Sequence, residues 1–535
     1  MTKARRWLPL LLFGIVFVSA LRPIRSYDGF WHLATGRWIV EHRALPLNDP
    51  FALASEQIRW INGEWLFQII LFGIEQLGGF MALGFLAGFL AGLSFALGAR
   101  EATRWTSPGA AMLIGLIGWL GAAHRIDARP ETAGIAMLAV FVAFALDRPT
   151  RFRNVGLVLV TMLWINLHPS ALLAPPALAL IVTGEALSGE VREKLRVRTG
   201  QLVLVTLSLL VNPWLVDGIL APFRLAGFLT REGIVNREWL PTDPAVFPLV
   251  YVSIVAGGVL LLASPDRKRL LPRTLLFAFL SILAARFVRN HGFLFAAMPL
   301  LLAPAIPALR PPMRKALGVI AAVLAAVLIL ASLPPRFGPH REIFPVESVA
   351  QLKAAGLKGN IYNPDQLGGY LIWSFHPARR VLTDGRNELF RDYIRLYGRS
   401  RVDSRIWAQL LRKYEIDLAV EEYRNAPVEV VDARTGRRDL LPASSVYFPP
   451  ERWALIAFDD AAMILARREA FDPAKLASME LRSLVPDGFS AATVIRGDPE
   501  QARKELGRAQ QQLGPSRRLE ILKELLGGRP RNPIS

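Results

Sequence analysis

The sequence predicts a polytopic α-helical membrane protein that carries a soluble α/β domain after its membrane part. Of the 535 residues, 52% are hydrophobic and 20% are charged, whereas soluble chains carry about 25% charged residues. Between residues 7 and 333 the apolar residues form runs of about 15–20, the length of a helix that crosses a bilayer. From Pro334 onward the composition is that of a soluble protein. We therefore expect a transmembrane domain over residues 1–335, an extracytoplasmic α/β domain over 336–470 and a helical tail over 471–535.

The apolar runs predict about eleven spans. We take residues 7–21 as an uncleaved first span and 80–99 as the second. Residues 64–77 are apolar but short and contain Glu75, so we expect an interfacial or re-entrant helix there, separated from the next span by Gly78-Gly79. Two full spans over 64–99 are the alternative, and they would invert the orientation of all later segments. Further spans are expected at 109–123, 132–146, 155–168, 171–187, 201–213, 246–263, 273–286, 291–309 and 316–333.

Basic clusters between the apolar runs set the orientation. The formal net charge of +19 could suggest nucleic-acid binding, but its placement follows the excess of Lys and Arg in cytoplasmic loops. The sequence has no basic–aromatic ribonucleoprotein pattern and no zinc-finger spacing, so we expect no nucleic acid as a partner. We expect a cytoplasmic N-terminus and a periplasmic C-terminal domain in a bacterial inner membrane. The clusters lie at residues 3–6, 148–153, 192–198, 267–269 and 310–315.

The segment 22–65 holds the main candidate for a reaction centre. It places Asp28, His32, Arg37, Asp49 and Glu64 among tryptophans and phenylalanines, which collect at the boundary between membrane and water. Asp28 and His32 are one helical turn apart, so a carboxylate and an imidazole would share one helix face. An ordinary connecting loop is the alternative.

Polar groups also recur in the other loops that this orientation places outside. External arginines oppose the inside bias of basic residues, and ionisable groups at membrane depth indicate a site or pathway by default. The sequence Asn166-Leu167-His168-Pro169 breaks an apolar run and frees backbone groups that a polar cavity can satisfy. Arginines that only anchor helix ends are the alternative, and His168 alone is as readily structural. The candidates for substrate binding are Arg37, Asp49, Arg129, Asn166, His168, Arg237, Glu238, Arg286, Arg289 and His291.

The C-terminal part alternates short strand and helix patterns, which indicates a small α/β unit. Asp384-Gly385-Arg386 follows an expected strand end, where ligands bind in α/β folds, although a turn explains it better. The sequence has no glycine-rich phosphate loop with lysine, no Gly-x-Ser-x-Gly elbow and no His-Glu-x-x-His motif. We expect strands at 360–362, 380–383, 417–420, 453–458 and 462–466, a turn and helix at 368–373, one amphipathic helix over 391–414 and a helical pair after 498.

A carboxylate at the outer membrane face suits transfer of a group from a lipid phosphate. Burial raises a carboxyl pKa unless a cation lowers it again, and in either case Asp28 could accept a proton from an incoming hydroxyl or amine. Arginine forks hold a phosphate leaving group through paired hydrogen bonds. The absence of cysteine excludes thiolate nucleophiles, cysteine-ligated zinc and disulfides.

These residues resemble the GT-C glycosyltransferases, which are membrane enzymes that use polyprenyl-phosphate sugars. That family includes protein mannosyltransferases, aminoarabinose transferases and the catalytic subunits of oligosaccharyltransferase. The resemblance covers residues 1–335 and implies a GT-C-like bundle, with an acidic loop after span one, an interfacial helix and many further spans. The matching stretches are Tyr27-Asp28-Gly29-Phe30-Trp31-His32, Leu47-Asn48-Asp49-Pro50-Phe51, Glu64-Trp65-Leu66 and Trp164-Ile165-Asn166-Leu167-His168.

The resemblance implies that Asp28 is the catalytic base or a metal-associated acid, and we take His32 and Glu64 as further candidate catalytic residues. Many members carry two adjacent acids where this sequence has Asp28-Gly29, so a divalent metal (Mg²⁺ or Mn²⁺) is left open. Asp49 or Glu64 could supply a second oxygen ligand. The implied partners are a polyprenyl-phosphate-linked sugar, the lipid bilayer, and an acceptor glycan, lipid or protein.

Two other functions compete with this interpretation. A membrane transporter or flippase for an envelope precursor is suggested by the broken, proline-rich apolar runs near residues 166–175. A non-catalytic scaffold that presents the C-terminal domain to an envelope complex is the other alternative.

Overall fold

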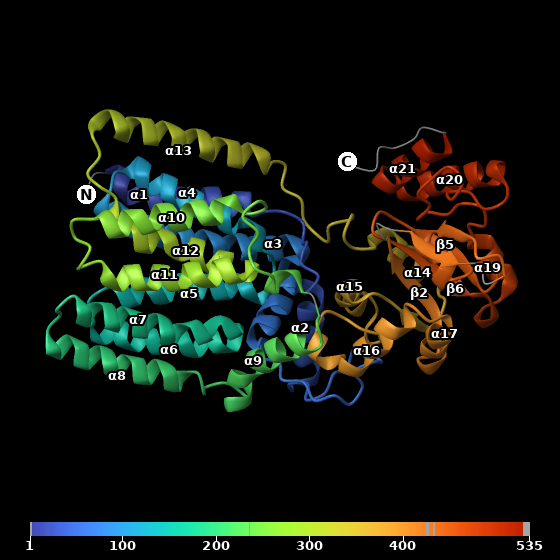
Figure 1. The fold of residues 1–535 in the computed structure, drawn as a ribbon, viewed down its shortest axis with the longest axis horizontal. Coiled ribbons are helices and arrows are strands. Elements are labelled where there is room, and N and C mark those ends of the chain that lie inside the picture. Colours follow the sequence, from blue (N-terminus) through green and yellow to red (C-terminus); the bar gives the residue numbers. More distant parts are fainter. Residues whose placement is uncertain (1–2, 235, 424–426, 432–433, 528–535) are drawn as a thin grey trace. The chain divides into compact units, whose positions relative to one another are not determined.

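The computed structural model describes residues 3–234, 236–423, 427–431 and 434–527, and these form two compact units. The helical unit comprises Met1–Leu45 and Ile61–Gly338, and the α/β unit comprises Pro46–Trp60 and Pro339–Ser535. The chain therefore leaves the helical unit once near its beginning, contributes a short segment to the α/β unit, and returns (Figure 1).

Helices occupy all the apolar runs that the sequence analysis identified. The helices are α1 (Lys3–Ser19), α2 (Gly29–His42), α3 (Trp65–Trp105), α4 (Pro108–Ala122), α5 (Pro130–Leu146), α6 (Arg151–Leu167), α7 (Ala174–Leu187), α8 (Arg192–Ser208), α9 (Val216–Arg231), α10 (Pro248–Ala263), α11 (Leu271–Arg286), α12 (His291–Leu302) and α13 (Pro311–Ala331). Short 3₁₀ turns lie at Ala123–Arg125, Pro169–Leu173, Arg237–Trp239, Val288–Asn290 and Ala303–Ala305. The helices α2 and α9 were not anticipated.

The expected eleven spans are confirmed only in part. Among the described residues, three helical stretches are long and apolar enough to cross a membrane: Trp65–Trp105, Pro169–Leu187 and Pro311–Ala331. Arg6–Ser19, Pro130–Leu146 and Pro248–Ala263 are apolar but shorter. Other helices are shorter or carry charged residues. The helix α8 begins with a charged stretch, and α12 is followed by a 3₁₀ turn at Ala303.

The break at Gly78-Gly79 occurs within one long element. Gly78 and Gly79 have non-helical dihedral angles inside the 41-residue α3, and Gly79 adopts φ +58° with ψ −151°. An L-residue rarely adopts that combination, so the kink requires glycine. The predicted interruption between residues 77 and 80 is thus confirmed as a kink.

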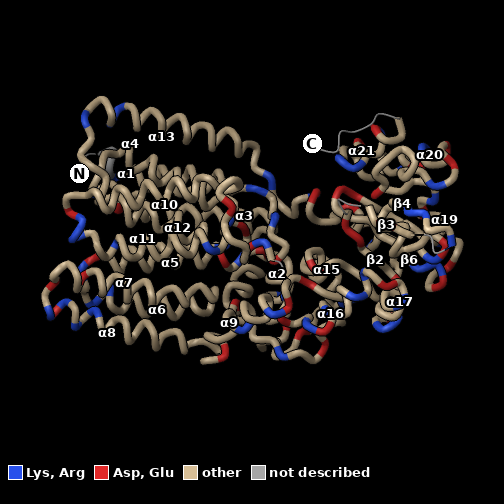
Figure 2. The backbone as a smooth tube through the Cα atoms, viewed as in Figure 1, with Lys and Arg blue, Asp and Glu red and all other residues tan. Residues whose placement is uncertain are grey.

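The centre of the helical unit is α12. All of its residues are buried, and it packs against α3, α4, α5 and α11. Figure 2 shows that the charged residues of this unit lie mainly at the two ends of the helices and that the middle stretches hold few of them. Function must therefore be sought at the helix ends.

The α/β unit contains a four-stranded sheet in the order β1-β2-β6-β5. The strands are β1 (Asn360–Tyr362), β2 (Ile416–Glu422), β5 (Trp453–Phe458) and β6 (Ala462–Arg467). β1 and β2 are parallel and the other pairs are antiparallel. A separate hairpin joins β3 (Val428–Val431) and β4 (Arg438–Leu441). The helices are α14 (Val346–Ala355), α15 (Asp365–Phe375), α16 (Arg391–Ser400), α17 (Ser404–Lys413), α18 (Ala443–Tyr447), α19 (Pro473–Met479), α20 (Pro499–Leu513) and α21 (Arg517–Leu526), with 3₁₀ turns at Asn387–Leu389 and Arg468–Ala470.

Two expected elements of this unit were wrong in detail. The helix expected over 391–414 is split into α16 and α17, because Asp403 caps a new helix by accepting hydrogen bonds from the amides of Arg405 and Ile406. The strand expected over 380–383 is reduced to isolated bridges at Val381, which pairs with Ile361 and Ala52. The other four expected strands and the helical pair after residue 498 are confirmed.

The segment Pro46–Trp60 pairs with the α/β unit through its backbone. The amides of Leu53 and Ala54 donate to the carbonyls of Val381 and Leu382 at 2.9 and 3.2 Å. The amide of Val381 donates to the carbonyl of Phe51 at 3.1 Å. A stretch of the first long loop thus supplies an extra strand-like edge to the α/β unit.

Candidate active site

Asp28 lies at the start of α2, where the helix dipole favours a negative charge. Its Oδ1 accepts a hydrogen bond from Trp31 Nε1 at 3.1 Å, and its backbone amide donates to Ser26 Oγ at 3.3 Å. Asp28 also interacts electrostatically with Arg129. The carboxylate is half-buried and has both an indole donor and a nearby guanidinium.

Glu64 precedes α3 and lies between two histidines. One carboxylate oxygen is 3.9 Å from His32 Nδ1, and the other is 3.8 Å from His168 Nε2. The Glu64 side chain is 22% exposed, whereas both imidazoles are almost fully buried. From the sequence we expected His32 and Glu64 to be catalytic and His168 to bind substrate, and the structure brings these three side chains together.

Hydrogen bonds fix the orientation of both imidazoles. The Gln68 amide lies 3.1 Å from His32 Nδ1 and exchanges hydrogen bonds with Asn62. The amide of Ser170 donates to His168 Nδ1 at 3.1 Å. Because that nitrogen accepts, a neutral His168 carries its proton on Nε2, which faces Glu64. Gln68 and Ser170 were missed by the sequence analysis, because an ordinary glutamine and serine in apolar helices carry no distinguishing pattern.

The space for this arrangement depends on Gly134 in α5. A Cβ at Gly134 would lie 2.4 Å from Ser170 Oγ and 3.0 Å from His168 Nδ1. The first distance is shorter than real Cβ contacts and the second is tighter than most, so a side chain here would force Ser170 or His168 to shift. Nearby, Asn166 Oδ1 accepts from Trp65 Nε1 at 2.9 Å, and its amide donates to the carbonyls of Met162 and Val211.

A cluster of two arginines and two glutamates connects the loop before α5 with the Arg237–Trp239 turn. Arg125 donates two hydrogen bonds to Glu131, at 2.9 and 2.5 Å, and its Nη1 lies 2.9 Å from Glu238. Arg129 bridges the same two glutamates at 2.8 and 3.0 Å. Burial alone would raise the pKa of Glu238, but Arg129 and Arg125 outweigh it and hold that pKa well below its ordinary value. Arg125 and Glu131 were missed, although both lie within three or four residues of Arg129 in the sequence.

The remaining predicted residues of the helical unit differ in exposure and in their neighbours, and among them Arg289 interacts electrostatically with His168 and Glu238. Arg37 is half-buried in α2, while Arg237 and Arg286 are exposed. Arg289 stacks over the Trp239 ring at 4.6 Å. His291 is fully buried, with Nε2 2.7 Å from Thr242 Oγ1 and Nδ1 3.1 Å from His124 Nε2. His291 therefore belongs to an internal hydrogen-bond chain.

Asp49 belongs to the α/β unit. Its carboxylate is fully buried, lies 2.9 Å from Arg386 Nη2 and accepts hydrogen bonds from Ser55 Oγ and the amides of Phe51 and Ala52. Arg386 also forms a bidentate pair with Asp384. The Asp384-Gly385-Arg386 turn thus provides the cation that Asp49 needs inside this unit.

The described residues offer no built metal site. Within them, no three His, Asp or Glu side chains converge so as to hold an ion. The carboxylates face arginines, an indole or imidazoles, as at Asp28, Glu64 and Asp49. We derive no step through a divalent cation.

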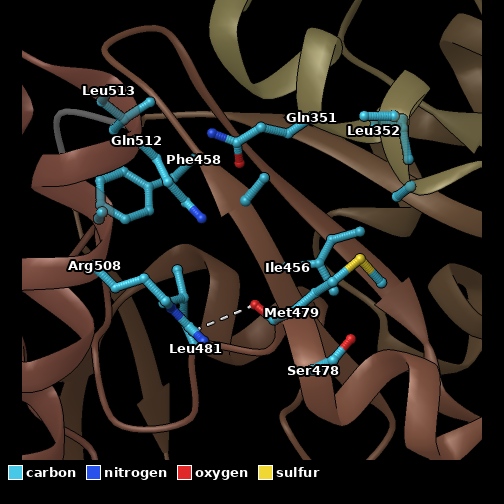
Figure 3. Close-up of a pocket in the computed structure, with 14 residues that line it drawn as sticks. Gln351, Leu352, Ile456, Phe458, Ser478, Met479, Leu481, Arg508, Gln512 and Leu513 are labelled. Atoms are coloured by element: carbon cyan, nitrogen blue, oxygen red, sulfur yellow. Dashed lines mark hydrogen bonds between the residues drawn. The ribbon is translucent and has the colours of Figure 1, made fainter.

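The α/β unit has a cavity of about 270 Å³ between α14, β5, α19 and α20. Figure 3 shows Gln351, Gln512 and Arg508 around it, with Phe458 and Met479 in its walls. Arg508 donates to the carbonyl of Glu480 at 2.7 Å. No carboxylate or histidine lines this cavity, so it offers hydrogen bonds but no acid or base.

The fold of this chain, a helical unit and an α/β unit, is similar to those of two solved proteins, ArnT and AglB, and this similarity bears out the expected resemblance. ArnT from Cupriavidus metallidurans, solved bound to undecaprenyl phosphate, aligns with a TM-score of 0.53 and 12% identity over 87% of this chain and 98% of its own. The archaeal oligosaccharyltransferase AglB from Archaeoglobus fulgidus, solved with an inhibitory peptide and a dolichol-phosphate, aligns with a TM-score of 0.55 and 10% identity over 98% of this chain and 86% of its own. Neither a scan of family models nor a search of curated sequences finds a match.

Proposed function

We propose that this protein is an integral-membrane glycosyltransferase that transfers a sugar from a polyprenyl-phosphate-linked donor to an extracytoplasmic acceptor. The observation that carries the proposal is a fold shared over most of the chain with two proteins solved with polyprenyl phosphates. Carboxylates, histidines and arginines gathered in the loops at one end of the helical unit add chemical support. The shared fold favours this function over a transporter or a scaffold.

Asp28 is our first candidate for the general base. Its carboxylate accepts a hydrogen bond from Trp31 and interacts electrostatically with Arg129, and an ionised carboxylate at this position can accept a proton from a hydroxyl or amine. Glu64 is the second candidate. The imidazoles of His32 and His168 flank its carboxylate, and the partial exposure of Glu64 leaves it accessible to an acceptor.

Arginines divide into two groups by their contacts. Arg129 is engaged by Glu131 and Glu238, so we assign it to positioning this loop and setting the field around Asp28. Arg237 and Arg286 are exposed and form no ion pair among the described residues. These two are our candidates for holding the lipid phosphate, through the bidentate hydrogen bonds that guanidinium groups make.

The test compares Asp28→Asn and Glu64→Gln with Glu41→Gln, an exposed acid at the end of α2. We would measure transfer of labelled sugar from a panel of undecaprenyl-phosphate-linked sugars, and binding of undecaprenyl phosphate itself. Loss of a general base should lower transfer by about a hundredfold or more with binding retained, and Glu41→Gln should be unaffected. Undiminished transfer by Asp28→Asn would remove Asp28 from the mechanism. If the wild type neither bound undecaprenyl phosphate nor transferred sugar, the proposed enzyme activity would be contradicted.

The proposed site requires the α/β unit and the acidic loops to be periplasmic in a bacterial inner membrane. The chain has no cysteine, so single cysteines can report sidedness without background. Val402→Cys in the α/β unit, an 89% exposed position, should react with an impermeant maleimide in intact spheroplasts. Arg267→Cys, between α10 and α11, should react only after lysis, and the reverse pattern would invert the orientation.

A further inference from the structure

A second cavity, this one in the helical unit, lies where α3 ends and α6 begins. Its volume is about 330 Å³. The helix α5 starts at the Glu131 cluster and ends at this cavity with Asp147, so the 17 residues of α5 separate the two places by about 25 Å. The cavity is therefore distinct from the candidate active site. It is lined by Leu97, Arg100, Glu101, Arg104, Ala143, Phe144, Asp147, Thr150, Phe152, Arg153 and Leu300.

The polar half of the cavity is positively charged. Arg104 lies 2.7 Å from Glu101 and 3.4 Å from Asp147, and Arg153 lies 2.8 Å from Asp147. Glu101 also pairs with Arg273 at 3.1 Å. Arg100 forms no ion pair in the described part of the chain. Four guanidinium groups thus face two carboxylates, and two positive charges remain uncompensated.

The other half of the cavity is apolar. Leu97, Phe144 and Leu300 line it, and exposed aromatic side chains flank it at Trp105 (54% exposed) and Phe152 (77%). Exposed aromatic residues at helix ends are typical of the membrane–water boundary. We therefore expect the arginines to lie near lipid headgroups, beside an apolar surface that suits acyl chains.

The loop that carries Asp147 is held in place by a buried arginine. Arg198 Nη2 donates to the carbonyls of Ala145 and Asp147, each at 2.8 Å. Arg198 is itself paired with Glu185. The end of α5 is therefore fixed without any ligand, and the cavity is preformed.

We infer that this cavity binds the headgroup of an anionic glycerophospholipid from the bilayer. Its phosphate would be held by Arg100, Arg104 and Arg153, and the first carbons of its acyl chains would lie on Phe144 and Leu97. Basic pockets between membrane helices bind anionic headgroups in this way. A free phosphate would make only the polar half of these contacts, so the apolar wall favours a lipid. The inference does not rest on the proposed enzyme activity.

The test is native mass spectrometry of the full-length protein with added dioleoyl phosphatidylglycerol or dioleoyl phosphatidylcholine. We expect preferential retention of phosphatidylglycerol, lowered about fivefold by Arg100→Gln and reduced to the phosphatidylcholine level by Arg100→Gln/Arg104→Gln/Arg153→Gln. The matched control is Arg192→Gln/Arg267→Gln/Arg269→Gln, which removes the same charge from nearby loops outside the cavity. It should retain the lipid like the wild type.

Three outcomes would overturn the inference. Equal retention of the two lipids would show that the cavity does not discriminate between headgroups by charge. An equal loss of phosphatidylglycerol in the control variant would show a diffuse effect of surface charge. Complete displacement of phosphatidylglycerol by millimolar inorganic phosphate would show a free-anion site. Because Arg104 and Arg153 also pair with carboxylates, Arg100→Gln is the variant least able to disturb folding, and its elution as a monodisperse species should match the wild type. Binding of undecaprenyl phosphate should be unchanged in it.

Discussion

Replacing Arg386 by methionine tests whether the segment Pro46–Trp60 is anchored in the α/β unit by buried charge. The Arg386 side chain is 2% exposed, pairs with two carboxylates that are fully buried, and stacks over the Trp60 ring at 4.5 Å. Arg386→Met keeps most of the packing but leaves Asp49 and Asp384 without their cation. Removing one partner of a buried ion pair costs about 3–5 kcal/mol.

The reporters are the amides of Leu53 and Ala54, which bond to Val381 and Leu382. A loss of about 3 kcal/mol or more in local stability should speed their hydrogen exchange by at least about a hundredfold. Burial already raises the pKa of Asp49, and protonation would remove its charge in the variant. The defect should therefore be smaller at acidic pH and grow as the pH rises.

The matched control is Arg380→Gln. Arg380 lies 2.8 Å from Glu56, in the same segment, but both side chains are about half exposed. An exposed pair contributes about 0–1 kcal/mol, so exchange at Leu53 and Ala54 should change little. If Arg386→Met exchanged no faster than Arg380→Gln, the buried charges would not be what holds this segment.

Three further predictions concern the helical unit. Gly134→Ala should displace Ser170 and His168 and lower transfer at least about tenfold, with monodisperse elution retained; normal transfer would contradict the packing at Gly134. Glu238, whose depressed pKa comes from Arg129 and Arg125 in spite of burial, stabilises the folded state above its ordinary value of 4.5, and this contribution is lost as the pH falls below that value. The apparent melting temperature of Glu238→Gln in detergent should therefore drop less on acidification than that of the wild type, and parallel drops would refute this. Gly79→Ala meets no neighbouring atom but strains the backbone, so it should destabilise the protein by about 1–3 kcal/mol, and an unchanged melting temperature would contradict a required kink.

Local pattern was sufficient to find most elements. Hydropathy located the helices of the bundle, Gly78-Gly79 located the kink in α3, and the alternation of short strand and helix patterns located four strands. It could not find α2 as a helix, because its apolar residues are mixed with polar ones in a loop-like stretch. Several apolar runs also form helices that are shorter than a membrane span, so the expected number of spans is confirmed only in part.

The sequence predicted many of the residues that make up the site, but it did not predict which of them form ion pairs with one another. Asp28, His32, Glu64 and His168 stood out because polar groups are rare beside apolar runs. The sequence could not show that Glu238 would join Arg125 and Glu131, since more than a hundred residues separate them. The same limit applies to Asp49, whose partner Arg386 is remote in sequence and lies in what looked like an ordinary turn.

The placement of Pro46–Trp60 has a consequence for biogenesis. This segment is synthesised before α3, yet the strand edge and the arginine that receive it belong to residues made only after the whole bundle. On our proposed topology it must be exported early and wait, unpaired, until the last third of the polypeptide arrives. An isolated fragment beginning at Pro339 would lack this edge, so expressing the α/β unit alone should require residues 46–60 to be supplied as a fused or separate peptide.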